Sequence, residues 1–475
     1  MLNAKYKATI GLEIHAELKT KSKMFCGCKN DPEESEPNKN ICPICTGHPG
    51  TLPVINKQAV KNVLKVGVAI GADLADFTEW DRKNYFYPDI PKGYQISQYK
   101  YPLVSGGLLH GVKITRIHLE EDTASSSHEG GDYSLVDFNR AGVPLMELVT
   151  EPVIHSGKEA ADFARELQLL LQYLGAGEAN MEKGEMRIEA NISVSQTDTL
   201  GTKVEVKNIN SFKAVEKAVA YEIERHIGVL ESGGSIVQET RGWNEDRQAT
   251  FTQRLKENSH DYRYFPDPDL PKFKISEMPE FDREVLRKEF PELPWEKRDR
   301  YEKDYGIKAG DVEIYIKPGL ISSFFEKVCA DFAGDKNLIK LASNYITSDL
   351  LGLMKNADVE SLGLVSDKNF SDLIKMVAES KISSRGAKDI LKMMFEKGGQ
   401  PMEIAETENL LQKSDLGELQ AIAEKIIIDS PKIVADYKAG KEVALQSLVG
   451  QGMKATKGSA NPQVLKEVFL SLLNK

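Results

Sequence analysis

Residues 11–18 alternate between apolar and polar side chains, and the polar ones are of types that bind metal ions. In an extended strand, Glu13, His15 and Glu17 point to one face and the apolar residues to the other. Similar polar stripes recur in three later segments: His118, Glu120 and Asp122; Arg187, Glu189 and Asn191; Glu205 and Lys207. A single stripe is typical of the exposed face of an ordinary sheet. Several acidic strands in one sheet repel one another unless cations lie between them, so the repetition predicts a site for Mg²⁺ and a nucleotide.

The motifs that the sequence lacks indicate how a nucleotide would be held. There is no G-x-x-x-x-G-K-[ST] loop, no protein-kinase signature set and no strand-linked G-x-G-x-x-G turn. Metal ions and side chains must therefore bind the phosphates. By position and charge, Arg187 and Lys207 are the candidate phosphate partners, and Glu189 is a further candidate for the nucleotide site.

Residues 81–98 mix cations with tyrosine, proline and glycine. Lys83, Tyr85 and Lys92 are the candidates here for contact with RNA, because cations bind phosphates and aromatic rings stack on bases. A tyrosine-rich turn that packs on the sheet explains the same composition equally well. Residues 261–269 have similar chemistry and the same two interpretations.

Four of the five cysteines lie close together, with the spacing C-x-C-x₁₃-C-x-x-C: Cys26, Cys28, Cys42 and Cys45. Four thiolates suit a tetrahedral structural zinc ion. The alternatives are four free thiols in a turn-rich segment, or a site in which His48 replaces one cysteine. Cys329, isolated in an apolar helical pattern, is interpreted as a core residue. So few cysteines in so long a chain indicate a reducing compartment.

The charge of the C-terminal segment is opposite in sign to that of the chain. The net charge is −10 overall, whereas residues 431–475 carry seven Lys, no Arg and three acids, a net of +4. This segment is therefore the candidate for contact with a nucleic-acid backbone. Lys454 and Lys457 lie in its glycine-rich stretch, for which a solvated loop is the alternative.

The elements that must position these residues can be read from hydrophobic periodicity. Strands are expected at 7–18, 111–121, 133–139, 145–149, 186–195 and 203–208, and helices at 57–72, 158–174 and 211–228. Hairpin-type spacing favours an antiparallel sheet, hence an α+β fold. From residue 321 onward, apolar residues recur at helical spacing and predict an all-helical region.

The 475 residues exceed what one hydrophobic core supports, so several domains are expected. The predicted boundaries give a catalytic domain at 1–292, a helical domain at 293–405 and a small helical tail domain at 406–475. The start of the chain has no apolar signal-like region, and no apolar run approaches the length of a membrane span. A cytoplasmic protein without membrane contact is expected.

Six segments together resemble the tRNA-dependent amidotransferase B subunit family: 11–18, 81–98, 118–122, 136–152, 204–212 and 261–271. The resemblance extends over essentially the whole chain, and residues 450–462 resemble the terminal signature of the family, with Gly452 where an aliphatic residue is usual. It implies a catalytic cradle domain similar to the glutamine synthetase and guanido-kinase fold, which holds ATP and magnesium, then the helical domain and the tRNA-binding tail.

The resemblance also implies the residues of the site. The family's magnesium ligands match Glu13, His15, Glu121, Glu147 and Glu205, although strand alternation points to Glu120 instead of Glu121. Lys207 is expected beside them in catalysis. In this family, ATP phosphorylates the aspartyl or glutamyl side chain of a misacylated tRNA, because a carboxylate does not otherwise react with ammonia.

The sequence has no serine-rich motif with the lysine of a glutaminase, so ammonia must come from elsewhere. The resemblance implies an amidase (A) subunit as the source and a small C subunit that completes a heterotrimer. Two other functions are compatible with the residues: a non-catalytic tRNA-binding or assembly subunit, and a glutamine synthetase-like ligase acting on a small molecule. Which misacylated tRNA is used does not follow from the sequence.

Overall fold

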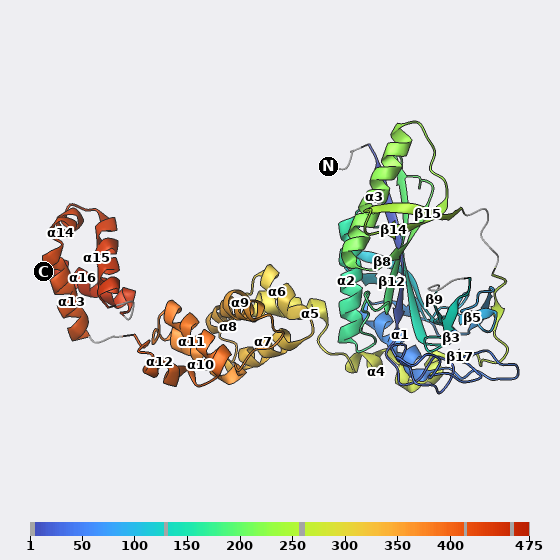
Figure 1. Cartoon of the computed structure of the whole chain (residues 1–475), viewed down its shortest axis with the longest axis horizontal. Coiled ribbons are helices and arrows are strands. Elements are labelled where there is room, and N and C mark those ends of the chain that lie inside the picture. The colour runs from blue at the N-terminus through green and yellow to red at the C-terminus, as the bar shows by residue number, and fades with distance from the viewer. Residues whose placement is uncertain (1–4, 128–131, 256–261, 413–415, 457–459, 475) are drawn as a thin grey trace. The chain divides into compact units, whose positions relative to one another are not determined.

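A computed structural model describes the chain except for residues 1–4, 128–131, 256–261, 413–415, 457–459 and 475. The chain forms two compact units, residues 1–294 and 295–475 (Figure 1). The first unit is a sheet with helices and the second is helical, so the predicted α+β class is confirmed. The division into three domains stays a prediction.

One ten-stranded sheet dominates the first unit, in the order β15-β14-β13-β12-β1-β11-β8-β6-β2, with β7 paired to β8. Its long strands are β1 (Lys7–Glu17), β8 (Val112–Glu121), β11 (Pro144–Thr150), β12 (Met186–Ser195), β13 (Val204–Ile209), β14 (Glu239–Asn244) and β15 (Ala249–Leu255). The short ones are β2 (Asp73–Leu74), β6 (Val104–Ser105) and β7 (Leu108–Leu109). Five predicted strands are thus confirmed as β1, β8, β11, β12 and β13.

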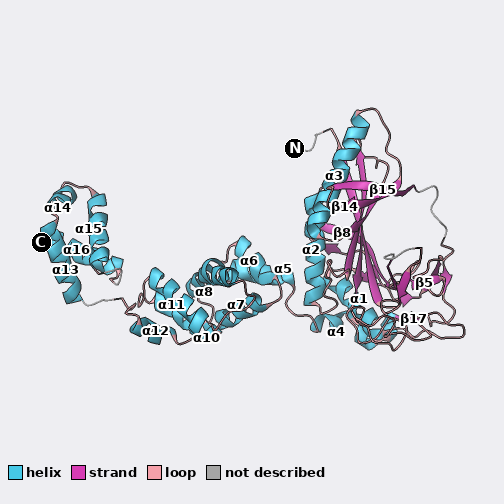
Figure 2. Ribbon diagram, in the orientation of Figure 1, coloured by secondary structure: helices cyan, strands magenta, loops and turns pink. Residues whose placement is uncertain are grey.

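Three helices pack on one side of this sheet: α1 (Lys57–Ala69), α2 (Gly157–Tyr173) and α3 (Phe212–Glu231) (Figure 2). Each begins at a polar cap whose side chain accepts backbone N–H groups of the first turn, from Asn56, Ser156 and Ser211 respectively. The apolar residues of β1 and β12, among them Leu12 and Ile188, are buried, as expected for the helix-covered face. The polar residues of the same strands consequently point to the other face.

The prediction of an antiparallel sheet is wrong at one position, because β13 pairs with β14 in parallel. Parallel neighbours cannot be joined by a tight turn, and here α3 makes the crossover between them. The predicted strand at 133–139 is also shorter and lies elsewhere. It forms β10 (Leu135–Asp137), which pairs with β9 (Ser125–Ser127) outside the main sheet.

A three-stranded sheet carries the tyrosine-rich segments, in the order β16-β4-β5. Its strands are β4 (Asp81–Asn84), β5 (Tyr94–Ser97) and β16 (Phe265–Pro266). Residues 81–98 and 262–266, far apart in the chain, are therefore neighbours. Two further short strands, β3 (Phe77–Thr78) and β17 (Phe273–Lys274), pair with each other, and α4 (Arg283–Lys288) follows.

The second unit is helical, as predicted. Its first part contains α6 (Ala309–Ile316), α7 (Leu320–Asp331), α8 (Lys336–Asn344), α9 (Leu351–Ala357), α10 (Asp367–Ala378), α11 (Ser384–Lys397) and α12 (Pro401–Thr407). The charged segment that precedes them forms α5 (Pro294–Asp299), which continues as a π-helical stretch, Arg300–Asp304. Residue 406 lies inside α12, which packs against α10 and α11. In the part of the chain that the structure describes, no helix is long and apolar enough to cross a membrane.

The tail contains α13 (Leu416–Asp429), α14 (Pro431–Lys438), α15 (Glu442–Ala455) and α16 (Pro462–Leu473), which enclose a core of their own. Gly452 lies on α15 where a Cβ atom would come within 2.7 Å of the Leu465 side chain on α16. The glycine therefore permits the close approach of these two helices. Asn461 caps α16 and Pro462 occupies its first turn.

Candidate functional site

Residues that pair directly across neighbouring strands place their side chains on the same face of a sheet. His15 pairs with Glu147 on one side and with Arg187 on the other, and Glu147 pairs in turn with His118. Two residues further along β1, and so on the same face, Glu13 lies opposite Glu189. The polar stripes of four strands therefore merge into one polar face, opposite the face that the helices cover.

The first cluster on this face contains two imidazoles and two carboxylates. Nε2 of His15 lies 3.3 Å from Oε2 of Glu147 and 3.7 Å from Oε1 of Glu120. Nε2 of His118 lies 3.1 Å from Glu147 and 3.8 Å from Glu120. Donor atoms of His15, Glu120 and Glu147 all lie within 4.8 Å of one another, close enough to share one metal ion.

The protonation of this first cluster depends on its mutual charges. Burial would lower the pKa of His118, but Glu147 and Glu120 outweigh this effect and raise it to about 9. Burial would likewise lower the pKa of His15, and the same two carboxylates raise it. Burial would raise the pKa of Glu147, yet His118 and His15 hold it well below its usual range. The carboxylates are thus ionised and ready to bind a cation, which would take over the role of the imidazole protons.

A second cluster adjoins the first along β1 and contains Glu13, Glu189 and Glu205, whose donor oxygens also lie within 4.8 Å of one another. Lys207 is 2.8 Å from Glu189 and 3.8 Å from Glu205. Nδ2 of Asn191 donates to Glu13 at 2.8 Å, while its buried Oδ1 has no hydrogen-bond partner among the described residues. Three carboxylates beside an unpaired oxygen fit a hard cation such as Mg²⁺.

Further charged residues extend this polar face beyond the first cluster. Arg187 donates to Asp122 at 2.8 Å, and Arg140 lies 3.7 Å from the same carboxylate. Burial and the charge of Asp122 raise the pKa of Glu17 to about 8, although Arg187 and Arg140 act in the opposite direction. Arg187 and Lys207 are thus both on the polar face, as the sequence predicts, but each already has a carboxylate partner.

The three-stranded sheet lies against this site. Ser97 of β5 donates its hydroxyl to Glu120 at 2.9 Å, and Gln98 accepts the backbone N–H of Leu119 at 3.0 Å. Lys83 of β4 is half-buried; burial would lower its pKa, but the charges of Glu120 and Glu147 help to raise it. Lys83 therefore supplies positive charge to the first cluster, a position compatible with a phosphate or with the RNA contact expected from sequence.

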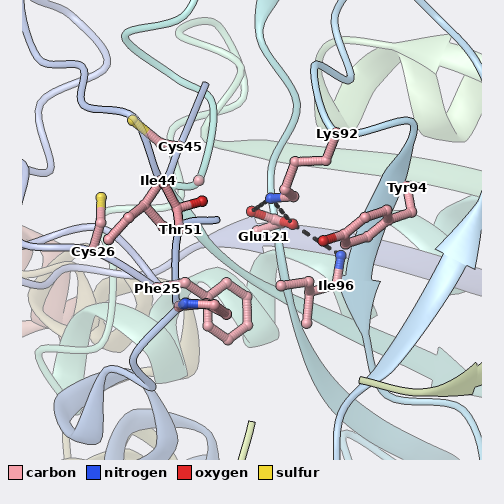
Figure 3. A pocket seen from close by; sticks show the side chains of 11 residues that line it. Phe25, Cys26, Ile44, Cys45, Thr51, Lys92, Tyr94, Ile96 and Glu121 are labelled. Atoms are coloured by element: carbon pink, nitrogen blue, oxygen red, sulfur yellow. Dashed lines mark hydrogen bonds and ion pairs between the residues drawn. The ribbon is translucent and has the colours of Figure 1, made fainter. Parts of the chain in front are cut away.

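Glu121 does not join the clusters, contrary to the expectation from the family resemblance. Its carboxylate accepts hydrogen bonds from Lys92 at 2.5 Å and from the backbone N–H of Ile96 at 2.9 Å (Figure 3). Strand alternation gives the reason, because Glu121 and Glu120 point to opposite faces of β8. On this strand it is Glu120 whose carboxylate lies with His15 and Glu147. Lys92, expected to contact RNA, is instead paired with Glu121.

The four cysteines that the sequence singles out come together, with all four Sγ atoms within 4.8 Å of one another. Sγ of Cys42 and Sγ of Cys45 are 3.9 Å apart, near the ~3.8 Å that tetrahedral zinc at about 2.3 Å from each sulfur requires. A hydrogen bond from Cys26 and the charge of Lys23 lower the pKa of Cys45 to about 5, which favours the thiolate. This donor set fits a closed structural zinc site, and His48 is outside it.

The thiol cluster packs against the segment that contains Lys92. Cys26, Cys45, Lys92, Tyr94 and Glu121 line one pocket (Figure 3). Gly47 has a positive φ of 72°, and a Cβ atom there would lie 3.0 Å from the backbone nitrogen of Lys92. The cysteine loop therefore supports the turn that positions Lys92 and, through it, Glu121.

The remaining RNA candidates lie in different surroundings. Tyr85 is half-buried and donates its hydroxyl to Gln95 at 3.2 Å. Lys454 is exposed on α15, and Lys457 lies outside the described residues.

Several residues of the site carry no signal of their role in the sequence. Ser97 donates its hydroxyl to Glu120, and the hydroxyl of Thr240 donates to Glu205 at 2.7 Å, but nothing local distinguishes these two hydroxyls from others in the chain. His118 and Asp122 belong to the predicted polar stripes, yet the alternation alone assigns them no role. Their place in the site depends on which strands become neighbours.

The chain is similar to known proteins over nearly its whole length. Residues 8–279 match the GatB/GatE catalytic domain model and residues 323–473 match the GatB domain model. The B subunit of the aspartyl/glutamyl-tRNA(Asn/Gln) amidotransferase of Caldanaerobacter subterraneus is 46% identical over 99% of this chain and 100% of the relative. Proteins of the same name from a Thermoanaerobacter species and from Gloeothece citriformis are 44% and 42% identical, over 99% and 98% of this chain and 100% and 98% of the relatives.

Proposed function

Because the chain belongs to the family of aspartyl/glutamyl-tRNA(Asn/Gln) amidotransferase B subunits, we propose that the polar face of its main sheet activates the carboxylate of a misacylated tRNA. The enzyme to which such a subunit belongs is a glutamine-hydrolysing carbon–nitrogen ligase that amidates Glu-tRNA(Gln), Asp-tRNA(Asn) or both. A carboxylate oxygen of the esterified residue attacks the γ-phosphorus of ATP and ADP leaves. Ammonia then attacks the acyl phosphate, and phosphate leaves with the activated oxygen.

The observation that carries this proposal is the pair of adjoining donor clusters on one face. Glu13 and His15 are two residues apart on β1, and each belongs to a different cluster. In-line phosphoryl transfer between two anions needs positive charge near both of them. Divalent cations, when bound there, would supply that charge, and the all-carboxylate cluster of Glu13, Glu189 and Glu205 is the one best suited to Mg²⁺.

The side chains around the clusters have roles of their own. Arg187 and Lys207 would bind phosphate oxygens of ATP in competition with their present partners, Asp122 and Glu189. Lys83 would offset the negative charge of the transferred phosphoryl group beside Glu120. Glu189 is predicted from the sequence to contact the nucleotide. In this proposal it would do so indirectly, as a ligand of the cation in the cluster with Glu13 and Glu205. Because these cationic side chains are already in place, less free energy is needed to bring the phosphates of ATP and the substrate carboxylate together.

Other components complete the reaction. An amidase subunit that hydrolyses glutamine would supply the ammonia, and a small third subunit would complete a heterotrimer, in the cytoplasm. Zinc would bind Cys26, Cys28, Cys42 and Cys45 and support the cradle domain, 1–292. The tail domain would contact the tRNA backbone through Lys454 and its neighbours, joined to the cradle by the helical domain.

Reconstituted complex tests the proposal. We expect ATP hydrolysis to depend on misacylated tRNA, and amidation to proceed with glutamine and with ammonium as nitrogen donor. Glu13→Ala and Glu147→Ala should each abolish amidation with both donors while the Kd for tRNA changes little. Normal amidation by both variants would show that the clusters are not the reaction site.

Two rival functions predict different results. A non-catalytic tRNA-binding subunit would show no tRNA-dependent ATP turnover. A small-molecule ligase would keep its activity when the tail is deleted. Because α12 packs against α10 and α11 and the tail core begins in α13, the deletion should remove residues 413–475 and leave α12 intact. We expect the deletion to weaken tRNA binding with little change in the KM for ATP.

A further inference from the structure

Two tyrosines from distant segments form a parallel aromatic stack beside the site. The rings of Tyr99 and Tyr264 have centroids 4.3 Å apart and an interplanar angle of 11°. Tyr99 follows β5, and Tyr264 immediately precedes β16, so pairing of both strands with β4 brings them together. The sequence pattern in 81–98 and 261–269 gives no indication of this pair, since Tyr99 lies outside both segments.

The two rings of the stack differ in exposure. Tyr99 is 64% exposed, whereas Tyr264 is half-buried. Ser97, two residues before Tyr99, donates its hydroxyl to Glu120 at 2.9 Å, so the stack lies close to the first cluster. One face of the Tyr99 ring is covered by Tyr264, so only the outer face can receive another planar group.

Hydrogen bonds anchor the backbone beside both tyrosines. The backbone N–H of Tyr99 donates to the buried carboxylate of Asp81 at 3.0 Å. Asn84 binds the segment that contains Tyr264, donating from its side chain to the carbonyl of Arg263 at 2.8 Å. A stacking surface fixed before binding loses little conformational entropy when a base settles on it.

We propose that the outer face of Tyr99 binds the unpaired adenine base at the 3′ end of the aminoacyl-tRNA, which extends the Tyr264–Tyr99 stack. This inference rests on the proposed function. The amino acid is esterified to the ribose of that same nucleotide, so a base held at Tyr99 keeps the ester and side chain near Glu120, which Ser97 contacts two residues before Tyr99. The esterified glutamate or aspartate has no planar ring that could stack on Tyr99.

Two cations near this position are already paired with carboxylates. Arg82 of β4 is occupied by Asp267 at 2.6 Å and Asp269 at 3.0 Å, and Lys92 by Glu121. The polar face itself is rich in carboxylates, which repel a phosphate backbone. An uncharged purine face avoids that repulsion, and stacking on an aromatic ring binds unpaired bases without needing a cation.

The test uses the reconstituted complex and two uncharged tRNAs, one intact and one lacking the 3′-terminal adenosine. With the wild-type complex, the truncated tRNA should bind about tenfold more weakly, the size of one lost stacking contact. Tyr99→Ala should bind both tRNAs at the weaker level, and Tyr99→Phe, which keeps the ring, should restore the difference. Thermal unfolding of each variant checks that the fold is retained.

Tyr87 provides a matched control. It is 58% exposed and on the neighbouring loop, but it meets Tyr85 at a steep 64° angle and is not part of the stack. Tyr87→Ala should therefore discriminate between the two tRNAs as the wild type does. The proposal is overturned if Tyr99→Ala still binds the intact tRNA more tightly than the truncated one, or if Tyr87→Ala loses this difference instead. It is also overturned if Tyr99→Ala raises only the KM for ATP, because the Tyr99–Tyr264 stack would then be an ATP site. Failure of the wild-type complex to amidate would refute the proposed function separately.

Discussion

Nε2 of His118 lies 3.1 Å from Oε2 of Glu147, and the two residues face each other in register on β8 and β11. This pairing fixes which side chains of β8 belong to the site. Residues 118, 120 and 122 share the polar face, and residue 121 points away from it. The distinction between Glu120 and Glu121 can therefore be tested directly.

Glu120→Gln should lower amidation with ammonium by about 100-fold or more, because the first cluster loses a charged ligand that acts on the transferred phosphoryl group. Glu121→Gln is the neighbouring control of identical chemistry. It should keep the wild-type dependence of rate on Mg²⁺ concentration, since its carboxylate is bound to Lys92 and Ile96. If the rate of Glu121→Gln depends differently on Mg²⁺ concentration while that of Glu120→Gln does not, then Glu121, and not Glu120, binds the metal ion.

Metal analysis of the purified chain should find about one zinc per chain, as expected for one closed site of four thiolates. Cys45→Ser should lose the zinc and lower the melting temperature of the first unit, because the loop that supports Lys92 loses its cross-link. His48→Ala should retain zinc, since His48 lies outside the thiol cluster. Full zinc content in Cys45→Ser would disprove the four-cysteine site.

A buried ionic network outside the two clusters predicts how stability depends on pH. Glu222 on α3 is fully buried and binds Arg225, Arg241 and Thr250. Burial would raise its pKa, but His226 and Arg225 outweigh burial and lower the pKa to about 2. The ionised carboxylate therefore stabilises the fold at pH above 4.5, its usual pKa, and this contribution is lost as pH falls toward 2.

Glu222→Gln should consequently reduce the free energy of unfolding of the first unit at pH 7 by about 2–3 kcal/mol. The gap between variant and wild type should narrow progressively below pH about 4.5, where the unfolded carboxyl of the wild type takes up a proton. Urea unfolding at a series of pH values measures this difference in the free energy of unfolding. A gap that is independent of pH would mean that packing, and not charge, gives Glu222 its effect.

Salt dependence of tRNA binding tests the role of the tail. Lys454→Ala should weaken binding about threefold to tenfold near physiological salt and reduce the slope of log K against log salt by about one, the signature of one lost phosphate contact. Lys441→Ala is the control, because Lys441 is paired with Asp436 at 2.8 Å. Equal slopes for Lys454→Ala and wild type would locate the backbone contact elsewhere.

The sequence by itself determined the strands and helices with strong periodicity, because alternation in β1, β8 and β12 and helical spacing in α1–α3 are local properties. It also predicted that the four closely spaced cysteines come together, as the structure shows. The positive net charge of the tail likewise follows from its amino-acid composition alone. The resemblance to the amidotransferase B subunits rests on six sequence segments, and the comparisons with known proteins confirm it.

The tertiary structure alone decided which side chains share a site. The separation of Glu120 from Glu121, the grouping of Glu189 with Glu13 and Glu205, and the pairing of Lys92 with Glu121 depend on the register between strands. The same is true of the parallel β13–β14 pair and of the Tyr99–Tyr264 stack. Register is set by packing of residues far apart in the chain, and local periodicity carries no information about which distant strand becomes a neighbour.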